Sequence, residues 1–304
     1  MTLLIVGDAE DLTSAYVGFR AQQHGLPVRI LDESRFGADW RLHLDDGNAG
    51  SDAVEFASGD VLPLRQVAGA FVRFTPTPEV PAVLREDPLV TETYARERRA
   101  ALHVLLHRIA APVANPPGRG QANGSKPLQM TQLAKAGFDV PCWIAGNDVD
   151  QIRAFTARLP DGAIVKSCSG TRSEVRRCCE SFLELLAEGS CPVIVQKWVD
   201  GFDVRLHTVG EHSFATAIEA GPGVDYRFDD TRRQYLAYSA PQAVVEKCLK
   251  FAHVQGLLLA GFDFRVDGEG HWWCLECNPA PTFLPYEMET GQAIADTLLA
   301  SMGG

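Results

Sequence analysis

The chain has 304 residues, of which 46% are hydrophobic and 22% charged, so it can bury a sizeable core divided over two or three subdomains. Its formal net charge of −11 argues against a general affinity for nucleic acid, because phosphate backbones are bound by an excess of Lys and Arg. The apolar segment at the start has no basic residues before it, and it ends at Asp8, which makes it too short for a signal peptide. No later stretch approaches the length and apolar character of a membrane span. We therefore expect a cytoplasmic protein.

The first third of the chain predicts a small α/β domain, since short apolar runs alternate with amphipathic segments. In order, we expect a strand over 2–6, a helix over 13–24, strands over 27–32 and 69–74, and a helix over 91–111. Residues 7–11 stand where a dinucleotide-binding turn would follow the first strand. They lack its G-x-G-x-x-G pattern, so we place no nucleotide there.

A Gly- and Pro-rich linker over 115–127 precedes a mixed α and β region. Ser125 and Asp148 are suited to cap helices, because their side chains accept hydrogen bonds from the first backbone N–H groups. We expect helices over 126–136, 148–159, 174–188, 241–255 and 290–302, and strands over 163–167, 193–198, 203–209 and 213–219.

Two apolar runs near the C-terminus, Gly261-Phe-Asp-Phe-Arg265 and Cys274-Leu-Glu-Cys-Asn-Pro279, are the most informative part of the chain. A turn rich in Gly and Asp joins them, which predicts an antiparallel hairpin. Alternate side chains share one face of a strand, so Glu276 and Asn278 lie together and the hairpin brings Asp263 opposite them. Three hard oxygen donors suit Mg2+, which prefers carboxylates together with phosphate oxygens. The implied ligand is a metal–nucleotide.

Eight cysteines lack a repeated paired spacing, so in a chain of this length we interpret them as reduced thiols. Cys274 and Cys277 do form a C-x-x-C motif. On a regular strand, residues three apart point to opposite faces, so we do not expect this pair to share a zinc ion or a disulfide. Filling of the core is the expected role.

Two lysines are candidate phosphate contacts, because an ammonium group is a compact charge that reaches between phosphate oxygens. Taken alone, Lys126 and Lys166 each fit a solvated surface residue better. Lys166, however, lies inside an apolar strand, where a charge needs a partner. The small polar loop after it contains Ser169, Gly170 and Thr171, whose backbone N–H groups can cover a triphosphate, although one glycine makes a weak phosphate-loop motif.

Adenine needs a flat apolar slot with backbone donors and acceptors, which a strand leading into a turn supplies. Gln196-Lys-Trp-Val199 fits this requirement, and a plain strand end is an equally good interpretation. Asp203 and Arg205, like Asp225 and Arg227, stand two residues apart on one strand face, so the acid can orient the guanidinium toward a phosphoryl or carboxylate group. Alone, each pair is more often a surface salt bridge.

The order of these motifs resembles that of the ATP-grasp carboxylate–amine ligases over residues 113–304. The matching segments are Ser125-Lys126, Ile164-Val-Lys166, Val195-Gln-Lys-Trp-Val199, Asp203-Val-Arg205, Asp225-Tyr-Arg227, Gly261-Phe-Asp263 and Leu275-Glu-Cys-Asn-Pro279. In detail the chain is similar to the branch of ribosomal-protein glutamate ligases and microviridin-type peptide macrocyclases, or graspetide synthetases. The segments that support this branch are Ala70-Phe-Val-Arg-Phe74, Val113-Ala-Asn-Pro-Pro117 and Tyr286-Glu-Met-Glu-Thr-Gly-Gln292.

This resemblance implies an ATP-grasp fold of α/β and α+β class with ATP and Mg2+ as cofactors. It divides the chain into an N-terminal domain (1–112), a central subdomain (113–195) and a C-terminal subdomain with the metal site (196–304). ATP phosphorylates a substrate carboxylate in this family, and an amine attacks the acyl phosphate. Clustered Arg, Lys and Mg2+ stabilise charge on the moving phosphoryl group, so no protein nucleophile is needed.

The resemblance also implies roles for individual residues. The nucleotide contacts are Lys126, Lys166, Ser169, Gly170, Thr171, Gln196, Lys197, Trp198, Val199 and Asp203; the catalytic groups are Arg205, Arg227 and Arg265; the Mg2+ ligands are Asp263, Glu276 and Asn278; and the substrate contacts are Arg73, Arg172 and Glu287. Arg73 ends a strand, where ligands gather in open α/β sheets, although a solvated arginine is an equally good interpretation.

We therefore expect an ATP-dependent ligase that forms an amide, or else an ester, on an amino acid, a peptide or a peptide-like metabolite. One alternative is a macrocyclase of a ribosomal precursor peptide, and another is an ATP-grasp kinase that phosphorylates a hydroxyl. A binding protein with an inactive ligase fold is disfavoured, because all three metal positions are filled. Related ligases are commonly oligomers, and Phe71, Phe74 and the helix over 91–111 could supply an apolar patch for a homodimer.

Overall fold

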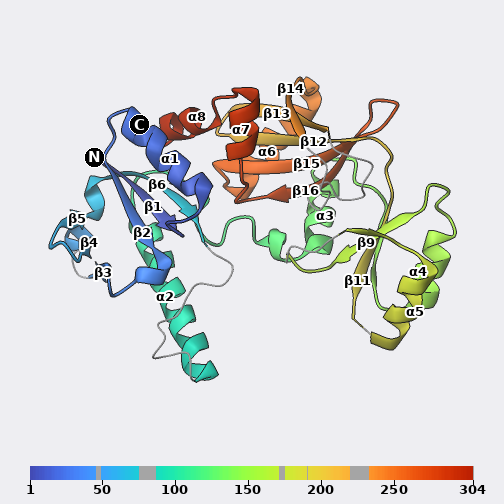
Figure 1. Ribbon diagram of the computed structural model, residues 1–304, viewed down its shortest axis with the longest axis horizontal. Helices are drawn as coiled ribbons and strands as arrows, with labels where there is room; N and C mark the ends of the chain where they lie inside the picture. Colours follow the sequence, from blue (N-terminus) through green and yellow to red (C-terminus); the bar gives the residue numbers. More distant parts are fainter. Residues whose placement is uncertain (46–48, 75–86, 171–174, 190, 220–232, 304) are drawn as a thin grey trace.

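The computed structural model describes residues 1–45, 49–74, 87–170, 175–189, 191–219 and 233–303. Its larger sheets lie in a row, with the N-terminal sheet at the left of Figure 1, the sheet of the C-terminal subdomain in the middle and that of the central subdomain at the right. Within the described ranges, no helix combines the length and the apolar character needed to cross a membrane.

The N-terminal sheet is parallel, with the strand order β2-β1-β6-β7. Its strands are β1 (Thr2–Gly7), β2 (Val28–Asp32), β6 (Val67–Arg73) and β7 (Val113–Ala114). Helix α1 (Leu12–Gln23) starts after Asp11, whose carboxylate accepts a hydrogen bond from the Ser14 N–H at 2.7 Å. The strands and the helix expected here are confirmed within a few residues.

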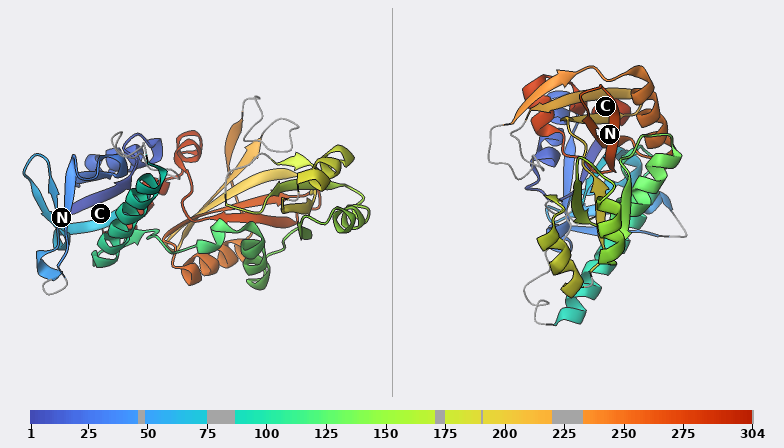
Figure 2. Two further views of the ribbon diagram at one scale, coloured as in Figure 1. Left: turned by 90° about the horizontal axis from the view of Figure 1, so that it is seen from below. Right: turned by 90° about the vertical axis from the view of Figure 1, so that its right-hand side faces the viewer.

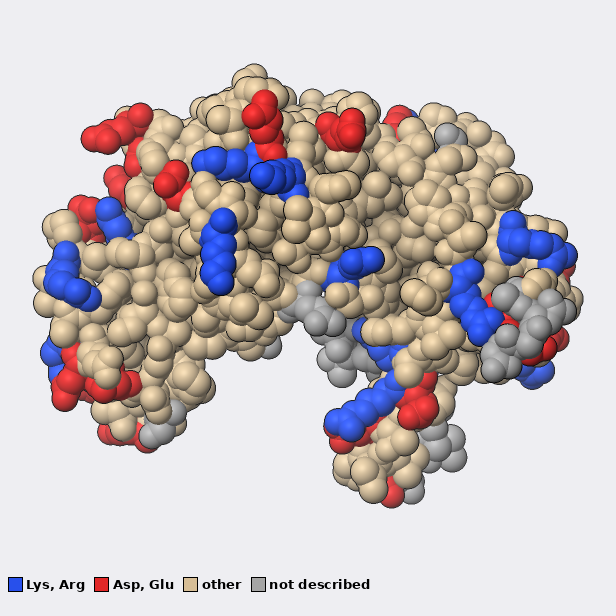
Figure 3. Space-filling view, turned by 180° about the vertical axis from the view of Figure 1, so that it is seen from behind, with Lys and Arg blue, Asp and Glu red and all other residues tan. Residues whose placement is uncertain are grey.

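A small antiparallel sheet, β3 (Trp40–His43), β4 (Ala53–Phe56) and β5 (Val61–Pro63), is an addition that the sequence did not predict, because its strands are only three or four residues long. Trp40 and Val54 pack with Leu102 and Leu105 of α2 (Pro88–Arg108) in one core. The N-terminal half of α2 projects from the body (Figure 1). In the view from behind, Lys and Arg side chains are scattered among Asp and Glu side chains and form no single patch on that face (Figure 3).

The central sheet has the order β10-β9-β11-β8 and is covered by two helices on one face. Its elements are β8 (Trp143–Gly146), α4 (Val149–Thr156), β9 (Ala163–Ser167), β10 (Arg176–Arg177), α5 (Glu180–Gly189) and β11 (Val193–Lys197). The helix expected from 174 starts only at Glu180, because Arg176 and Arg177 pair with Val165 and Ile164 of β9. Asp148 caps α4 as expected.

The C-terminal sheet is antiparallel, with the order β14-β13-β12-β15-β16. Its strands are β12 (Phe202–Val209), β13 (His212–Glu219), β14 (Gln234–Tyr238), β15 (Leu259–Val266) and β16 (Trp272–Asn278). Helices α3 (Lys126–Lys135) and α6 (Gln242–Gln255) cover one face, where Leu133, Phe251 and Phe262 share a core. Figure 2 shows these green and orange helices beneath the sheet in its left view. The other face is left for the cavity described below.

The N-terminal sheet and the end of the chain share a second core. The helix expected over 290–302 is observed as α8 (Ile294–Ser301). A short helix that the sequence did not predict, α7 (Leu284–Thr290), precedes it and ends at Gly291, whose φ is 70°. Leu3 and Phe71 pack with Leu298 of α8. The N-terminal domain is therefore joined to the C-terminal subdomain by a continuous apolar interface.

The sheets do not end at residues 112 and 195, where we expected the boundaries between the domains. Strand β7 extends the N-terminal sheet to Ala114, and β11 carries the central sheet to Lys197. Helix α3, which was grouped with the central subdomain, packs on the C-terminal sheet. Short 3-10 turns occur at Glu33–Arg35, Ala49–Ser51, Leu64–Gln66 and Gln121–Gly124.

Candidate active site

A cavity of about 450 Å3 lies between the central and C-terminal sheets. The residues expected at the site that line it are Lys126, Lys166, Gly170, Gln196, Lys197, Trp198, Val199, Asp203, Arg205, Asp263, Arg265, Glu276 and Asn278. Further lining residues are Asn123, Ile164, Val175, Arg233, Tyr235, Phe264, Leu275, Thr282, Pro285 and Tyr286. The fold thus brings most of the expected residues, from segments up to 152 positions apart (126 to 278), around one space.

The acidic wall of the cavity depends on a β-bulge in the expected hairpin. Phe264 pairs with Cys274, whereas the preceding Asp263 pairs with Glu276, so Leu275 is an extra residue in β16. A bulge changes the face that the following side chains take. Glu276 therefore lies directly opposite Asp263, while Cys274 and Cys277 are both buried in the same core. The expectation that these two cysteines face opposite ways was wrong, because it assumed a regular strand.

Arg205 on β12 completes the acidic wall. Its Nε and Nη2 atoms donate to the two carboxylate oxygens of Asp263 at 2.5 and 3.0 Å. Burial raises the pKa of Asp263 to about 7, with Arg205 opposing the rise and the facing Glu276 carboxyl adding to it. Two carboxyl groups that share one space in this way disfavour a second negative charge.

The donor set fits a Mg2+ ion. A divalent cation relieves the repulsion between Asp263 and Glu276, and it accepts a neutral amide oxygen as a further ligand. Asn278 supplies such an oxygen, and its Oδ1 atom also accepts from the Ala280 N–H at 2.9 Å, which orients the side chain. The described residues hold no group of three or more His, Cys, Asp or Glu side chains placed for a metal. Two carboxylates and one amide fit Mg2+, because this ion takes its remaining ligands from phosphate oxygens and water.

The basic wall lies at the junction of α3 and β9. The Lys126 Nζ atom donates to Ser167 Oγ at 3.1 Å and to the Ser169 carbonyl at 3.0 Å, so the lysine holds the loop that follows β9. Gly170 donates its N–H to the Gly124 carbonyl at 3.1 Å. Any Cβ atom on Gly170 would lie 2.3 Å from the Asn123 carbonyl oxygen, so only glycine permits this approach. Ser169 lies beside the cavity and does not line it.

The segment expected to meet adenine lines the cavity in an unexpected way. Gln196 lines the cavity, but it is buried and its side chain donates to the Pro141 carbonyl at 3.4 Å. Two guanidinium groups, of Arg177 and Arg265, lie over the Trp198 ring at 3.9 and 4.3 Å from its centroid. Because cations already occupy that ring, stacking of a base on Trp198 is disfavoured in this arrangement.

Arg265, expected as a catalytic group, is held by Asp203 of β12 and by Gly201, which precedes that strand. It faces Asp203 in the sheet and donates to both carboxylate oxygens at 3.3 and 3.4 Å, and to the Gly201 carbonyl at 3.0 Å. The geometry therefore suits orientation of Asp203 more directly than contact with a phosphoryl group.

Comparison with known proteins identifies the architecture. No protein-family model matches the sequence, and no curated protein matches it. Among solved structures, the ATP-grasp ligase PsnB, complexed with a minimal precursor, is 24% identical, with 99% of this chain and 97% of that chain covered and a TM-score of 0.84. This chain has the ATP-grasp fold. The expected fold is thereby confirmed.

Two further solved structures show a range of similarity to this chain. The macrocyclase MdnC from Microcystis aeruginosa MRC, bound with the precursor peptide MdnA, is 19% identical over 100% of both chains, with a TM-score of 0.86. D-alanyl-alanine synthetase A from Vibrio cholerae O1 biovar eltor str. N16961 is 13% identical, covers 99% of this chain and 97% of its own, and has a TM-score of 0.67.

Arg73, expected as a substrate contact, lies outside the cavity lining of the ATP-grasp fold. It donates to the Asp11 carboxylate, to the carbonyls of Ala280 and Pro281, and to Thr282 Oγ1, between 2.9 and 3.3 Å. These contacts use all five N–H groups of a guanidinium. In this conformation Arg73 connects the N-terminal domain to the segment after Asn278, and direct binding of a substrate stays a prediction.

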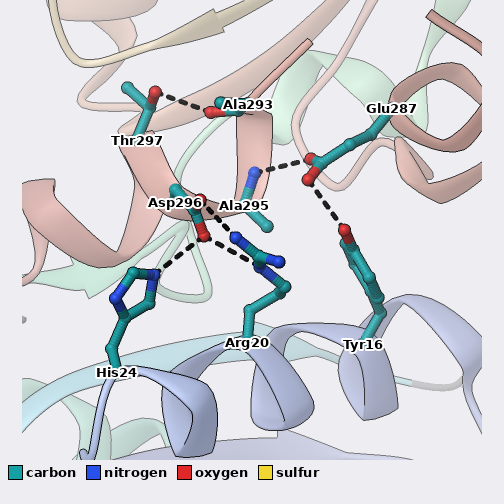
Figure 4. A network of polar contacts seen from close by, with 8 residues as sticks. All are labelled: Tyr16, Arg20, His24, Glu287, Ala293, Ala295, Asp296 and Thr297. Atoms are coloured by element: carbon teal, nitrogen blue, oxygen red, sulfur yellow. Dashed lines mark hydrogen bonds and ion pairs between the residues drawn. The ribbon is translucent and has the colours of Figure 1, made fainter. Parts of the chain in front are cut away.

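Glu287, the other described substrate candidate, is a buried residue of α7 that contacts α1 and α8. Its Oε1 atom accepts from the Tyr16 hydroxyl at 2.9 Å, and its Oε2 atom accepts from the Ala295 N–H at 2.7 Å (Figure 4). Arg20 and Asp296 form an ion pair beside it. Through these contacts Glu287 connects α7 to α1 and α8, which is a structural role. Thr171, Arg172 and Arg227 lie outside the described residues.

His207 is a site neighbour that the sequence did not indicate. Burial lowers its pKa to about 3, and Arg205 adds to the effect, so the ring is neutral. Its Nε2 atom lies 3.3 Å from the Thr282 carbonyl, which can only accept, so this nitrogen carries the proton. The ring also meets Tyr286 edge-on, with the centroids 5.0 Å apart. The sequence could have indicated His207, because it follows Arg205 by two residues and so lies on the same face of the strand.

Proposed function

We propose that this chain is an ATP- and Mg2+-dependent ligase that activates a carboxylate of a peptide as an acyl phosphate and joins it to an amine. The observation that carries the proposal is one cavity lined both by the basic residues Lys126 and Lys166 and by the oxygen donors Asp263, Glu276 and Asn278. A phosphate chain bound with a divalent cation needs this combination of charges. Solved structures of the same fold support it, since PsnB has been obtained with a precursor, Mg and ADP.

Each wall has a separate task in the proposed reaction. Lys126 and Lys166 bind phosphate oxygens, and Asp263, Glu276 and Asn278 hold Mg2+, which when bound neutralises negative charge on the phosphates. Both lysines come from segments that the fold fixes, because β9 pairs with β11 and the backbone N–H of Lys126 donates to the Cys168 carbonyl at 2.9 Å. Their charges are therefore placed before the nucleotide binds.

Arg205 stabilises the negative charge that develops on the phosphoryl group during transfer. The Asp263 carboxylate orients its guanidinium, and the ring of Tyr286 lies 5.6 Å from its Cζ atom, so the group is held on two sides. Preorganised cations of this kind need no rearrangement during the reaction, which is the main source of electrostatic catalysis. The attacking group comes from the substrate.

A macrocyclase that links side chains within a precursor peptide is the second candidate. The fold similarity to MdnC, whose structure contains its precursor peptide, favours it. Both candidates use the same cavity and differ in whether the amine or hydroxyl that attacks belongs to the same peptide as the activated carboxylate.

The test is a screen for ADP and phosphate release over pooled amino acids and short peptides rich in Asp, Glu, Lys and Thr, with mass spectrometry of the products. A ligase yields a product lighter than its joined components by one water. A macrocyclase yields a single peptide that has lost water. A kinase releases ADP without dependence on an amine and adds a phosphate to its substrate, and that outcome contradicts the proposal.

We also propose a homodimer or a higher homo-oligomer in the cytoplasm. Phe71 is only 1% exposed, and the Cζ atom of Arg99 lies 4.1 Å from the centroid of the Phe74 ring. Neither side chain therefore supplies the apolar patch expected for a dimer contact. Leu89 and Val104 of α2 are 72% and 46% exposed and are the better candidates. Light scattering at micromolar concentration tests the oligomeric state, since a mass near that of one 33.1 kDa chain contradicts the proposal.

The eight unpaired cysteines support the proposed cytoplasmic location, because free thiols are typical of a reducing compartment.

A further inference from the structure

Strand β16 is an edge strand that carries two of the proposed Mg2+ ligands. The C-terminal sheet ends at β16, and Glu276 and Asn278 lie on its cavity side. An edge strand has backbone N–H and C=O groups without a strand partner on one side, so its position is defined less firmly than that of a central strand. The bulge at Leu275 interrupts its pairing with β15 as well. The placement of the metal ligands therefore needs a second support.

Gln129 of α3 provides this support. Its Nε2 atom donates to the Cys277 carbonyl at 2.7 Å, and its Oε1 atom accepts from the Cys277 N–H at 3.1 Å. The side chain is buried, since Gln129 is only 5% exposed. One primary amide thus satisfies both backbone groups of the residue between Glu276 and Asn278, as the backbone of a further strand would do.

The same helix presents Lys126 to the cavity. Lys126 is the first residue of α3, and Gln129 follows three positions later, one turn along the helix. The backbone N–H of Gln129 donates to the Ser125 carbonyl at 3.0 Å, which fixes this turn. The two walls of the cavity are consequently connected by a short path, from Lys126 through the first turn of α3 and the Gln129 amide to the metal strand.

We propose that Gln129 is a positioning residue that holds β16 in register with the first turn of α3 and so sets the affinity of the site for Mg2+. This inference rests on the proposed function, because it assigns Mg2+ to Glu276 and Asn278. Groups that orient metal ligands from outside change metal affinity by about 10- to 100-fold when they are removed. Gln129 touches neither nucleotide nor metal, and it acts through the strand.

Calorimetric titration of the full chain with ADP, over a series of MgCl2 concentrations, tests the proposal. Gln129→Met has a similar length and no amide, and we expect it to raise the Mg2+ concentration needed for tight ADP binding by about tenfold. Its affinity for ADP without Mg2+ should stay within about twofold of the parent. Gln132→Met is the matched control on the same helix, because Gln132 Oε1 has no hydrogen-bond partner in the described part of the chain. It should behave like the parent.

The outcomes separate positioning from simple stabilisation. If Gln129→Met melts at a lower temperature but has the parent's Mg2+ requirement, Gln129 only stabilises the fold and the inference is overturned. If Gln129→Met does not fold, Gln129→Glu replaces it, since that variant keeps the size and the acceptor but not the donor to Cys277, and an unchanged Mg2+ requirement again overturns the inference. A parent protein whose ADP binding ignores Mg2+ refutes the proposed function itself.

Discussion

Replacement of Arg73 by alanine distinguishes a contact between domains from a contact with substrate. Its guanidinium donates to the Asp11 carboxylate at 2.9 and 3.2 Å and to the carbonyls of Ala280 and Pro281 at 2.9 and 3.0 Å. Those carbonyls follow Asn278, so Arg73 attaches the N-terminal domain to the segment next to the proposed metal site. Arg73→Ala removes every one of these bonds at once.

The expected loss follows from the geometry and burial of the pair. Hydrogen bonds to charged groups each contribute about 1.5–3 kcal/mol when their partners are desolvated. The Arg73 and Asp11 side chains are 17% and 24% exposed, so water screens the pair in part and replaces some of the lost bonds. We therefore expect Arg73→Ala to lower the free energy of unfolding by about 2 kcal/mol, which lowers Tm by roughly 4 °C in a chain of this size.

Thermal melts combined with steady-state kinetics check this expectation. Asp11→Asn is the control, because asparagine still caps α1 but has no charge to pair with the guanidinium. The Arg73 bonds to Ala280, Pro281 and Thr282 remain in this variant, so its loss in Tm should be smaller than that of Arg73→Ala. A contact between domains predicts a lower Tm in both variants and a substrate KM within about twofold of the parent. An unchanged Tm with a clearly raised substrate KM in Arg73→Ala refutes the structural interpretation and supports direct binding of substrate.

Three other changes test the site and the interface between domains. Glu276→Gln should keep the fold and lower turnover by about two orders of magnitude, as loss of an important electrostatic group does, and unchanged ADP production contradicts the metal assignment. Gly170→Ala places a methyl group 2.3 Å from the Asn123 carbonyl oxygen, so the loop must move; the KM for ATP should rise, and a normal KM argues against a phosphate role for the loop. Burial raises the pKa of Tyr16 to about 12, and the hydrogen bond to Glu287 adds to the rise. The folded value exceeds the ordinary value of 10.0, so this stabilisation is complete below pH 10 and is lost as the pH rises through 12. Tyr16→Phe should flatten the fall in Tm over that window, and an identical pH profile in both proteins disproves the assignment.

Local patterns in the sequence were sufficient for the elements that carry the site. Strand β9 was predicted with its observed bounds, because an apolar run of five residues between turn residues has few alternatives. The hairpin of β15 and β16 was predicted for the same reason. Alternation along a strand also placed Glu276 and Asn278 on one face, since side-chain direction has a period of two residues whatever the tertiary context. These properties depend on neighbours in sequence, so the sequence reports them directly.

Partners that are distant in sequence were determined only by the tertiary structure. The Gln129 amide meets Cys277 from 148 positions away, and Glu287 meets Tyr16 from 271 positions away. A polar residue in a helix has the same local pattern whether it faces water or an edge strand, so nothing in the sequence singled out Gln129. The bulge at Leu275 is a similar case, because the register between two strands depends on how both faces are buried. Residue types and local periodicity thus specified the chemistry of the site, and long-range packing determined which of these residues are held by the protein and which face the cavity.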